Sequence, residues 1–258
     1  MANGPAFAEA TQLSKIVPGL SVGCHVVLID GEPVLAPDRL PSLATGSHFC
    51  NELKTFAIRA LAGRINADEI IAEASAQIHR IQSAGIVVSH IDTHKHTHLF
   101  PNILRPLLEA ASACGVHALR NPFGPRRPLR SSQLMVRPNL WTRYAEVRIL
   151  RRFASRFRET VSGRGFATPD GTLGIEVTGA LDETLFSAIA RSIPEGTWEF
   201  VCHPGYNDAD LLAARTRLRE SRETELHVLT LPAAREILNR EGIELISYRG
   251  LTANPSAA

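Results

Sequence analysis

The sequence predicts an α/β fold in which parallel strands alternate with helices along the chain. Apolar, β-branched runs of strand length are separated by segments in which apolar residues recur with helical spacing. Gly85 and Gly115 close two of these helical segments just before the next strand begins. Strand, helix and strand in regular succession imply parallel strands joined by right-handed crossovers. The chain has 258 residues, no internal repeat and no clear linker, so we expect a single domain over residues 1–258.

The first half of the chain is predicted to alternate between helix and strand. Asn66 followed by Glu69 has the spacing of a capping box at the start of a helix. The expected elements are a helix over 5–16 with Phe7, Ala10, Leu13 and Ile16 on one face, a strand over 20–29, a proline-rich loop over 33–47, a helix from Asn66 to Gly85 with Ile70, Ile71, Ala74, Ile78 and Ile81 inward, a strand beginning at Ile86, a helix opening at Phe100-Pro101 and a short strand over 116–120.

The second half opens with a long connection over 121–138 that is rich in proline and arginine. A connection of this length is typical of a lid or a binding segment. The arginines of the next predicted helix, 141–158, favour a solvated outer face over an acidic partner or a membrane surface. The remaining expected elements are a turn-rich loop over 163–174, a helix over 181–193, a strand over 197–202, helices over 211–218 and 230–241, and a last strand over 243–248.

Composition argues against several classes of protein. A net charge of +2 is too small to indicate nucleic-acid binding, and no run of about 18 apolar residues predicts a membrane span. The first ten residues lack the charged start and apolar core of a signal peptide. Four cysteines without metal-type spacing are expected to be buried thiols of a reducing compartment. We therefore expect a cytoplasmic protein.

A histidine cluster directly after the strand that begins at Ile86 is the strongest functional signal. Chemistry in α/β folds sits beyond the carboxyl ends of the strands, and neutral imidazole is a common zinc ligand. In extended backbone His94, His96 and His98 would share one face. The cluster favours a metal or proton-transfer site over an inert solvated loop, although composition does not say which histidine binds.

Two further histidines lie in or after strand-like runs. His25 interrupts the run over 20–29, and alone it is more typical of a hydrogen-bonded core residue than of a ligand. His203 follows the predicted strand 197–202 and precedes Pro204-Gly205, again at the end of a strand. This position favours a functional role for His203.

Three motifs taken together resemble the YdjC-like carbohydrate deacetylases, which include chitooligosaccharide deacetylases and hopanoid-associated deacetylases. The motifs are GCHVVL at 23–28, DTHKHTHLFP at 92–101 and VCHPG at 201–205, and the resemblance covers essentially the whole chain. It implies an irregular TIM-like (β/α) barrel. The substrate it implies is an N-acetylated amino sugar, such as a chitooligosaccharide or a lipid-linked N-acetylglucosamine.

The resemblance also implies roles for particular residues. His25 and His94 would be metal ligands, and His203 would be the general acid that protonates the leaving amine. The ion would be Mg²⁺ or Zn²⁺, which activates water and polarises the acetyl carbonyl. The residues expected to bind substrate or to orient the ligands are Asp92, His96, His98 and Arg120. Asp92 in particular is suited to hold an imidazole in one tautomer.

The sequence departs from this family at its start. The family opens with an Asp-Asp-Phe-Gly motif that supplies a third ligand and the base, whereas this sequence contains no two adjacent aspartates. We therefore expect the first β-α unit of the barrel to be missing, either because the start of the sequence was assigned too late or because the chain is truncated, and the activity of this chain as written to be impaired. The neighbouring strand would then have an open edge, which favours aggregation or a homodimer.

Other functions receive less support from the sequence. Phosphoester hydrolysis would favour a carboxylate-rich two-metal site or a glycine-rich loop, and neither is visible. Nucleic-acid binding through the arginines of 126–158 lacks interleaved aromatic residues. A catalytically impaired protein that binds carbohydrate on the same fold remains the main alternative, because the aspartate ligand and base are absent.

Overall fold

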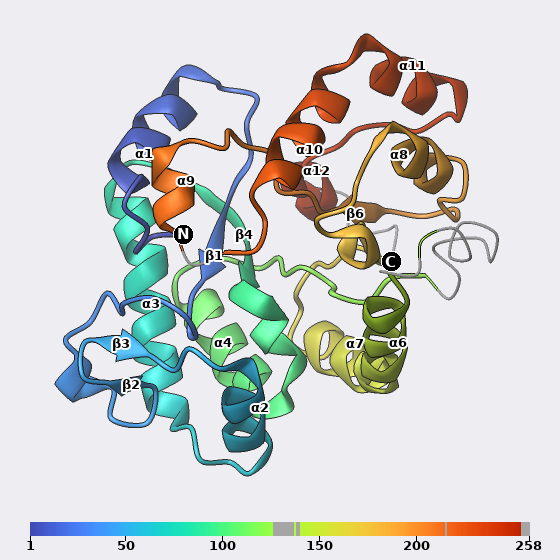
Figure 1. Cartoon of the computed structure of the whole chain (residues 1–258). Helices are drawn as coiled ribbons and strands as arrows, with labels where there is room; N and C mark the ends of the chain where they lie inside the picture. The colour runs from blue at the N-terminus through green and yellow to red at the C-terminus, as the bar shows by residue number, and fades with distance from the viewer. Residues whose placement is uncertain (126–136, 138–139, 215, 254–258) are drawn as a thin grey trace. The chain divides into compact units, whose positions relative to one another are not determined.

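The computed structural model describes residues 1–125, 137, 140–214 and 216–253 (Figure 1). Most of the proline- and arginine-rich connection predicted over 121–138 therefore lies outside the described residues. The chain divides into two compact units, which we describe separately. The first comprises Met1–Arg120, Phe153–Thr168 and Ile246–Ala258, and the second Asn121–Arg152 and Pro169–Leu245.

Parallel strands form the centre of the first unit. Strand β1 (Val22–Val26) pairs in parallel with β4 (Val88–Thr93), which places His25 opposite Asp92. Two isolated parallel bridges continue the order from Ile91 to Leu119 and from Ala118 to Ala167. The strand expected over 116–120 is thus reduced to bridges, but the parallel order that the sequence predicts is present.

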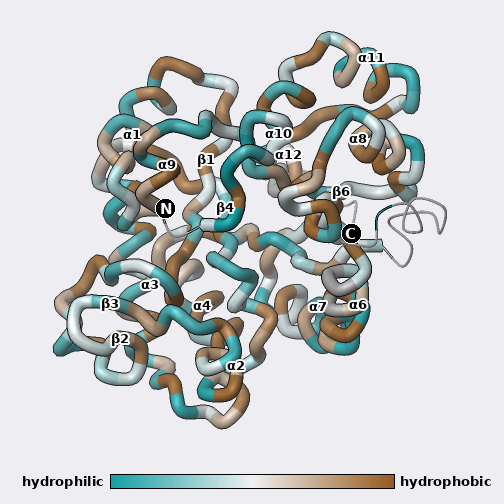
Figure 2. The backbone as a smooth tube through the Cα atoms, in the orientation of Figure 1, coloured by the Kyte–Doolittle hydropathy of each residue, from teal (hydrophilic) through white to brown (hydrophobic). Residues whose placement is uncertain are grey.

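Helices and a small hairpin complete the first unit. Helices α3 and α4 pack against each other and α3 also packs against β1, and hydrophobic and hydrophilic residues alternate along the helical tube as amphipathic helices require (Figure 2). The elements are α1 (Phe7–Ile16), η1 (Pro37–Arg39), β2 (Ala44–Thr45), β3 (His48–Phe49), α2 (Leu53–Leu61), α3 (Ala67–Ser83), η2 (His94–Leu99), α4 (Pro101–Ala113), α7 (Ala154–Ser162) and α12 (Tyr248–Ala253).

The cap of α3 forms as predicted, but the capping box does not. The Asn66 side chain accepts a hydrogen bond of 2.8 Å from the backbone N–H of Asp68. Glu69 does not reach back to Asn66, because its carboxylate accepts from the N–H groups of Ser42 and Leu43 at 2.8 and 3.2 Å. The N–H of Asn66 donates to the Ser42 hydroxyl instead, at 2.8 Å.

A buried polar stripe on α3 holds the proline-rich loop in place. Glu69, Glu73 and Gln77 are spaced four residues apart, so they lie on one face of the helix, and all three are buried. Gln77 bonds both the N–H and the C=O of Val27, at 2.9 and 2.8 Å. Glu73 accepts from the N–H groups of residues 34–35 at 2.8 and 3.0 Å. These bonds fix the chain that leaves β1 for the predicted loop.

Two predicted elements near the ends of the chain differ from the structure. Helix α1 forms, but none of its residues is buried, and Leu13 and Ile16 are 53% and 73% exposed. The last strand predicted over 243–248 is wrong, because these residues join no ladder and Tyr248 begins α12. Ile246, which would be buried in a strand, is 53% exposed.

The second unit is also α/β. Strand β5 (Gly171–Leu173) pairs in parallel with β6 (Trp198–Phe200), where the sequence predicts a turn-rich loop and a strand respectively. An apolar cluster that includes Leu173, Leu185 and Val228 forms its core. The helices are α6 (Trp141–Leu150), η4 (Arg151–Phe153), η5 (Ile175–Val177), α8 (Glu183–Ala190), α9 (Ala209–Ala213), α10 (Glu220–Thr230) and α11 (Pro232–Arg240).

Two predicted helices are shorter than expected. The helix over 141–158 is interrupted at η4, so that α6 ends at Leu150 and α7 begins at Ala154, and Phe157 of α7 lies beside His98 in the first unit. The helix over 211–218 ends at Ala213, and the N–H of Leu218 bonds the Thr216 hydroxyl at 3.1 Å instead.

The ladders among the described residues are three two-stranded sheets and two isolated bridges. An α/β architecture is therefore established, whereas the irregular barrel and the single domain stay predictions. No helix in the described ranges has both the length and the apolar character needed to cross a membrane.

Candidate metal centre

The carboxyl ends of β1 and β4 bring His25 and Asp92 into contact. His25 Nδ1 lies 2.7 Å from Asp92 Oδ2, and the Arg120 guanidinium contacts the same oxygen. Burial alone would raise the pKa of Asp92, but the neighbouring His25 and Arg120 hold it well below its usual range. The charged carboxylate therefore accepts the Nδ1–H of His25 and leaves Nε2 on the opposite side of the ring.

His94 faces this second nitrogen of His25. His25 Nε2 and His94 Nδ1 are 3.4 Å apart, and the two rings meet edge to face with centroids 5.6 Å apart. Burial, together with the charges of His25 and Lys95, lowers the pKa of His94 to about 4. His94 is consequently neutral at pH 7, which is the form that a metal ion requires.

The separation of these two nitrogens fits a shared ion. Two nitrogen ligands that each lie about 2.1 Å from a tetrahedral ion are about 3.4 Å apart, which is the edge of the tetrahedron. The two imidazoles thus suit two of the ligand positions of a divalent cation. Within the described ranges no third His, Cys, Asp or Glu joins them in a group able to hold an ion.

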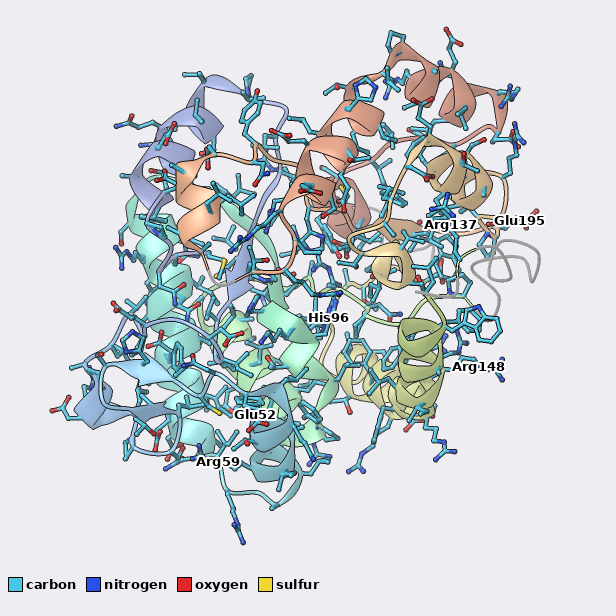
Figure 3. All side chains as sticks on the ribbon, viewed as in Figure 1. Glu52, Arg59, His96, Arg137, Arg148 and Glu195 are labelled. Atoms are coloured by element: carbon cyan, nitrogen blue, oxygen red, sulfur yellow. The ribbon has the colours of Figure 1, made fainter. Side chains whose placement is uncertain are left out.

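The loop that carries His94 is strained. Lys95 and His96 adopt φ values of 53°, and Asp30 on the facing loop adopts a φ of 56°. These left-handed conformations are uncommon for residues other than glycine. Asp30 forms an ion pair with Lys95, and its Oδ2 lies 3.7 Å from His94 Nε2. Figure 3 marks His96 on this loop between β4 and α4.

The expectation that His94, His96 and His98 share one face is wrong. The backbone enters η2 and turns left-handed at two residues, so it is not extended. His98 is fully buried and its Nδ1 lies 2.6 Å from the Thr93 hydroxyl. Burial holds the pKa of His98 well below its usual range, so this ring is neutral and supports the loop from within the first unit.

The predicted general acid belongs to the second unit. His203 follows β6, and its backbone N–H donates a hydrogen bond to the buried carboxylate of Glu225 on α10. The structure therefore groups His25, Asp92 and His94 with Arg120 in the first unit and describes His203 separately. The catalytic role of His203 stays a prediction.

Sequence reasoning missed three features around this centre. Neither the position of Asp30 beside the imidazole of His94 nor its ion pair with Lys95 is predicted by the sequence. Gly23 has no room for a side chain, because a Cβ there would collide with the ring of His90. His90 in turn stacks on Tyr248 with ring centroids 3.7 Å apart. The preference of aspartate for left-handed backbone was the one signal available for Asp30.

Comparison with known proteins adds an independent result. The family described as YdjC-like protein matches residues 1–240. A carbohydrate deacetylase of Geobacillus stearothermophilus is 32% identical over 252 residues, covering 96% of this chain and 83% of the relative. A chitooligosaccharide deacetylase of Serratia marcescens is 31% identical over 256 residues, covering 97% of this chain and 86% of the relative.

A solved structure supports the fold. A crystal structure from Enterococcus faecalis V583, named for a proposed role in cellobiose-phosphate cleavage, matches with a TM-score of 0.72 and 23% identity. The match covers 97% of this chain and 85% of that chain. At this identity the likeness concerns the fold alone.

Proposed function

The chain belongs to the YdjC-like protein family, and from this premise we propose that it is a hydrolase that removes acetyl groups from an N-acetylated amino sugar. Relatives that are about 30% identical over nearly the whole chain are named carbohydrate or chitooligosaccharide deacetylases. The observation that carries the proposal is the pair of facing nitrogens, His25 Nε2 and His94 Nδ1, at 3.4 Å.

His25 and His94 would hold the divalent ion, Mg²⁺ or Zn²⁺. A divalent ion supplies Lewis acidity, which polarises an amide carbonyl and acidifies water. Asp92 accepts the Nδ1–H of His25 at 2.7 Å and so keeps the Nε2 lone pair directed at His94. Arg120 pairs with Asp92, and this keeps the carboxylate charged although it is only 4% exposed.

Amide hydrolysis also needs a proton for the departing nitrogen. We assign this role to His203, because a histidine is the most common general acid and this one follows the end of a strand. The hydrogen bond from the His203 backbone to Glu225 supports a fixed position for the residue within the second unit.

The finer features of the proposal rest on the family. They are an N-acetylglucosamine substrate, either a chitooligosaccharide or a lipid-linked sugar, an irregular barrel, a cytoplasmic location and a homodimer. The parallel order of β1, β4 and the bridged segments at 118–119 and 167 supports the barrel, because neighbouring barrel strands follow each other in this way.

A second candidate is a carbohydrate-binding protein without hydrolytic activity. The specific observation in its favour is that, in the part of the chain that the structure describes, only two imidazoles group at the centre. Two ligands hold a divalent ion more weakly than three. This candidate predicts that chitooligosaccharides bind but release no acetate.

Acetate release from N-acetylglucosamine oligomers tests the proposal. With added Mg²⁺ or Zn²⁺ we expect release by the wild type, and a loss of at least about 100-fold in His25→Ala and His94→Ala. His48→Ala is the matched control, because His48 is an exposed histidine that pairs with Glu32 at 3.3 Å. Wild-type binding by calorimetry without acetate release would favour the binding protein, and equal activity in all variants would reject the assigned ligands.

A further inference from the structure

The chain that leaves β1 is anchored so that Asp30 has little freedom. The side chain of Gln77 holds Val27 through both its N–H and its C=O. Three residues later, the N–H of Asp30 donates to the C=O of Cys50 at 3.0 Å. The backbone is thus fixed on both sides of a short turn, and the turn directs the Asp30 carboxylate toward the loop that carries His94.

Two strained residues meet at this point. Asp30 and Lys95 have φ values of 56° and 53°, and their side chains form an ion pair. Aspartate tolerates the left-handed conformation, whereas lysine does so with a cost. Strained backbone clusters at functional sites, where the surrounding structure maintains it for a purpose. We therefore expect Asp30 and Lys95 to have a functional role beside their structural one.

We infer that Asp30 is a positioning residue for His94: its carboxylate takes the Nε2–H of the imidazole and so leaves the Nδ1 lone pair directed at His25. Asp30 Oδ2 lies 3.7 Å from His94 Nε2, which is longer than a hydrogen bond and within reach of a small side-chain rotation. The Lys95 ammonium contacts the same oxygen and holds the carboxylate beside the ring.

With this assignment, each of the two imidazoles has a carboxylate on the side of the ring away from the other imidazole. Asp92 bonds the Nδ1 side of His25, and Asp30 lies on the Nε2 side of His94, so the remaining nitrogens of the two rings are the ones that face each other at 3.4 Å. A carboxylate behind a metal-binding histidine fixes its tautomer and raises its basicity. The inference rests on the proposed function in so far as a divalent ion is what the two nitrogens receive.

Asp30 is not itself assigned as a ligand. It lies at Nε2 of His94, whereas His25 lies at Nδ1, and the two ring nitrogens point to different sides of the imidazole. An ion shared by the two histidines would sit on the side of the ring away from Asp30. The carboxylate therefore acts through His94.

The tautomer of His94 in the metal-free protein is the direct test. Two-dimensional ¹H–¹⁵N spectra of the full chain at pH 7.5, assigned with His94→Gln, distinguish Nε2–H from Nδ1–H. The two tautomers compete, because Nδ1–H of His94 could donate to His25 Nε2 at 3.4 Å and Nε2–H could donate to Asp30. We expect Asp30 to raise the fraction of Nε2–H in the wild type, and this fraction to fall in Asp30→Gly, which keeps the left-handed backbone without a carboxylate. Asp30→Asn, whose amide oxygen can still accept a hydrogen bond, should fall between them. Glu32→Gln is the matched control, because Glu32 pairs with His48 on the same loop.

Zinc affinity measured by calorimetry is the second readout. We expect Asp30→Gly to weaken Zn²⁺ binding by about 10–100-fold and Glu32→Gln to leave it unchanged. An unchanged tautomer ratio in Asp30→Gly, with circular dichroism matching the wild type, would overturn the inference. Because the tautomer is read without metal or sugar, the inference can stand even if the wild type releases no acetate.

Discussion

A buried carboxyl group in the second unit should make stability fall as the pH rises. Glu176 is 2% exposed, and its Oε1 has no hydrogen-bond partner among the described residues. Burial raises the pKa of Glu176 from 4.5 to about 7, against the opposing effects of its own backbone N–H and of Arg151. The folded protein therefore holds this proton more tightly than the unfolded chain does.

The sign and size of the effect follow from linkage. The extra stability is fully present below pH 4.5 and is lost as the pH rises through about 7. At about 1.4 kcal/mol for each pH unit between the two values, the change in the free energy of unfolding is about 3 kcal/mol. Glu176→Gln keeps the shape of the side chain without the titration, so its stability should lack this component.

Urea unfolding at pH 5, 6, 7 and 8 measures the difference. The free energy of unfolding of the wild type relative to Glu176→Gln should fall by about 2.5 kcal/mol between pH 5 and pH 8, because part of the full change lies below pH 5. Glu195→Gln, which changes an exposed glutamate of the same unit, is the control and should give a constant difference. A difference for Glu176→Gln that stays within about 0.5 kcal/mol over this range would refute the reasoning.

Three further predictions concern the first unit. Asp92→Asn should destabilise the protein by about 3 kcal/mol in urea unfolding, because Arg120, whose side chain is 14% exposed, loses the charged carboxylate of Asp92. An unchanged midpoint would contradict this. Gln77→Leu should cost about 2–4 kcal/mol by the same assay, since the N–H and C=O of Val27 lose their bonds; amide exchange at Val27 should accelerate with it. Burial raises the pKa of Cys24 to about 12, so its thiol should stay unmodified at pH 8 while more exposed cysteines react with a disulfide reagent.

The parts of the fold that the sequence predicted well are those governed by short-range patterns. Three examples are the Asn66 cap, the buried face of α3 and the strand that ends before the histidine cluster. Each of them depends on residues that are close together in the sequence. The strand expected over 243–248 failed because an apolar run becomes a strand only when a neighbouring strand pairs with it. The residues of the run alone do not show whether a neighbouring strand is present.

In the candidate centre, too, sequence motifs predicted some residues, whereas contacts between distant segments determine others. The family motifs predicted His25 and His94 as partners although 68 positions separate them in the chain, and parallel pairing puts His25 opposite Asp92. The contribution of Asp30 was not predictable in this way. Its N–H bonds the C=O of Cys50, and the chain before it is held at Val27 by Gln77, a buried polar residue on α3 that the apolar periodicity of the helix does not single out.

The left-handed backbone of Lys95 and His96 explains how the loop after β4 keeps His94 close to His25. His94 follows Asp92 by two positions, so a continuing strand would carry its ring onward past His25, which lies opposite Asp92. The backbone instead leaves the strand after Thr93 and turns at Lys95 and His96, and this turn keeps His94 within 3.4 Å of His25. The ion pair of Lys95 with Asp30 and the Thr93–His98 hydrogen bond hold opposite parts of that turn. Among the described residues, the non-glycine residues with left-handed backbone are Asp30, Lys95 and His96, all beside the ligands, and the geometry of the two imidazoles depends on the contacts that hold them.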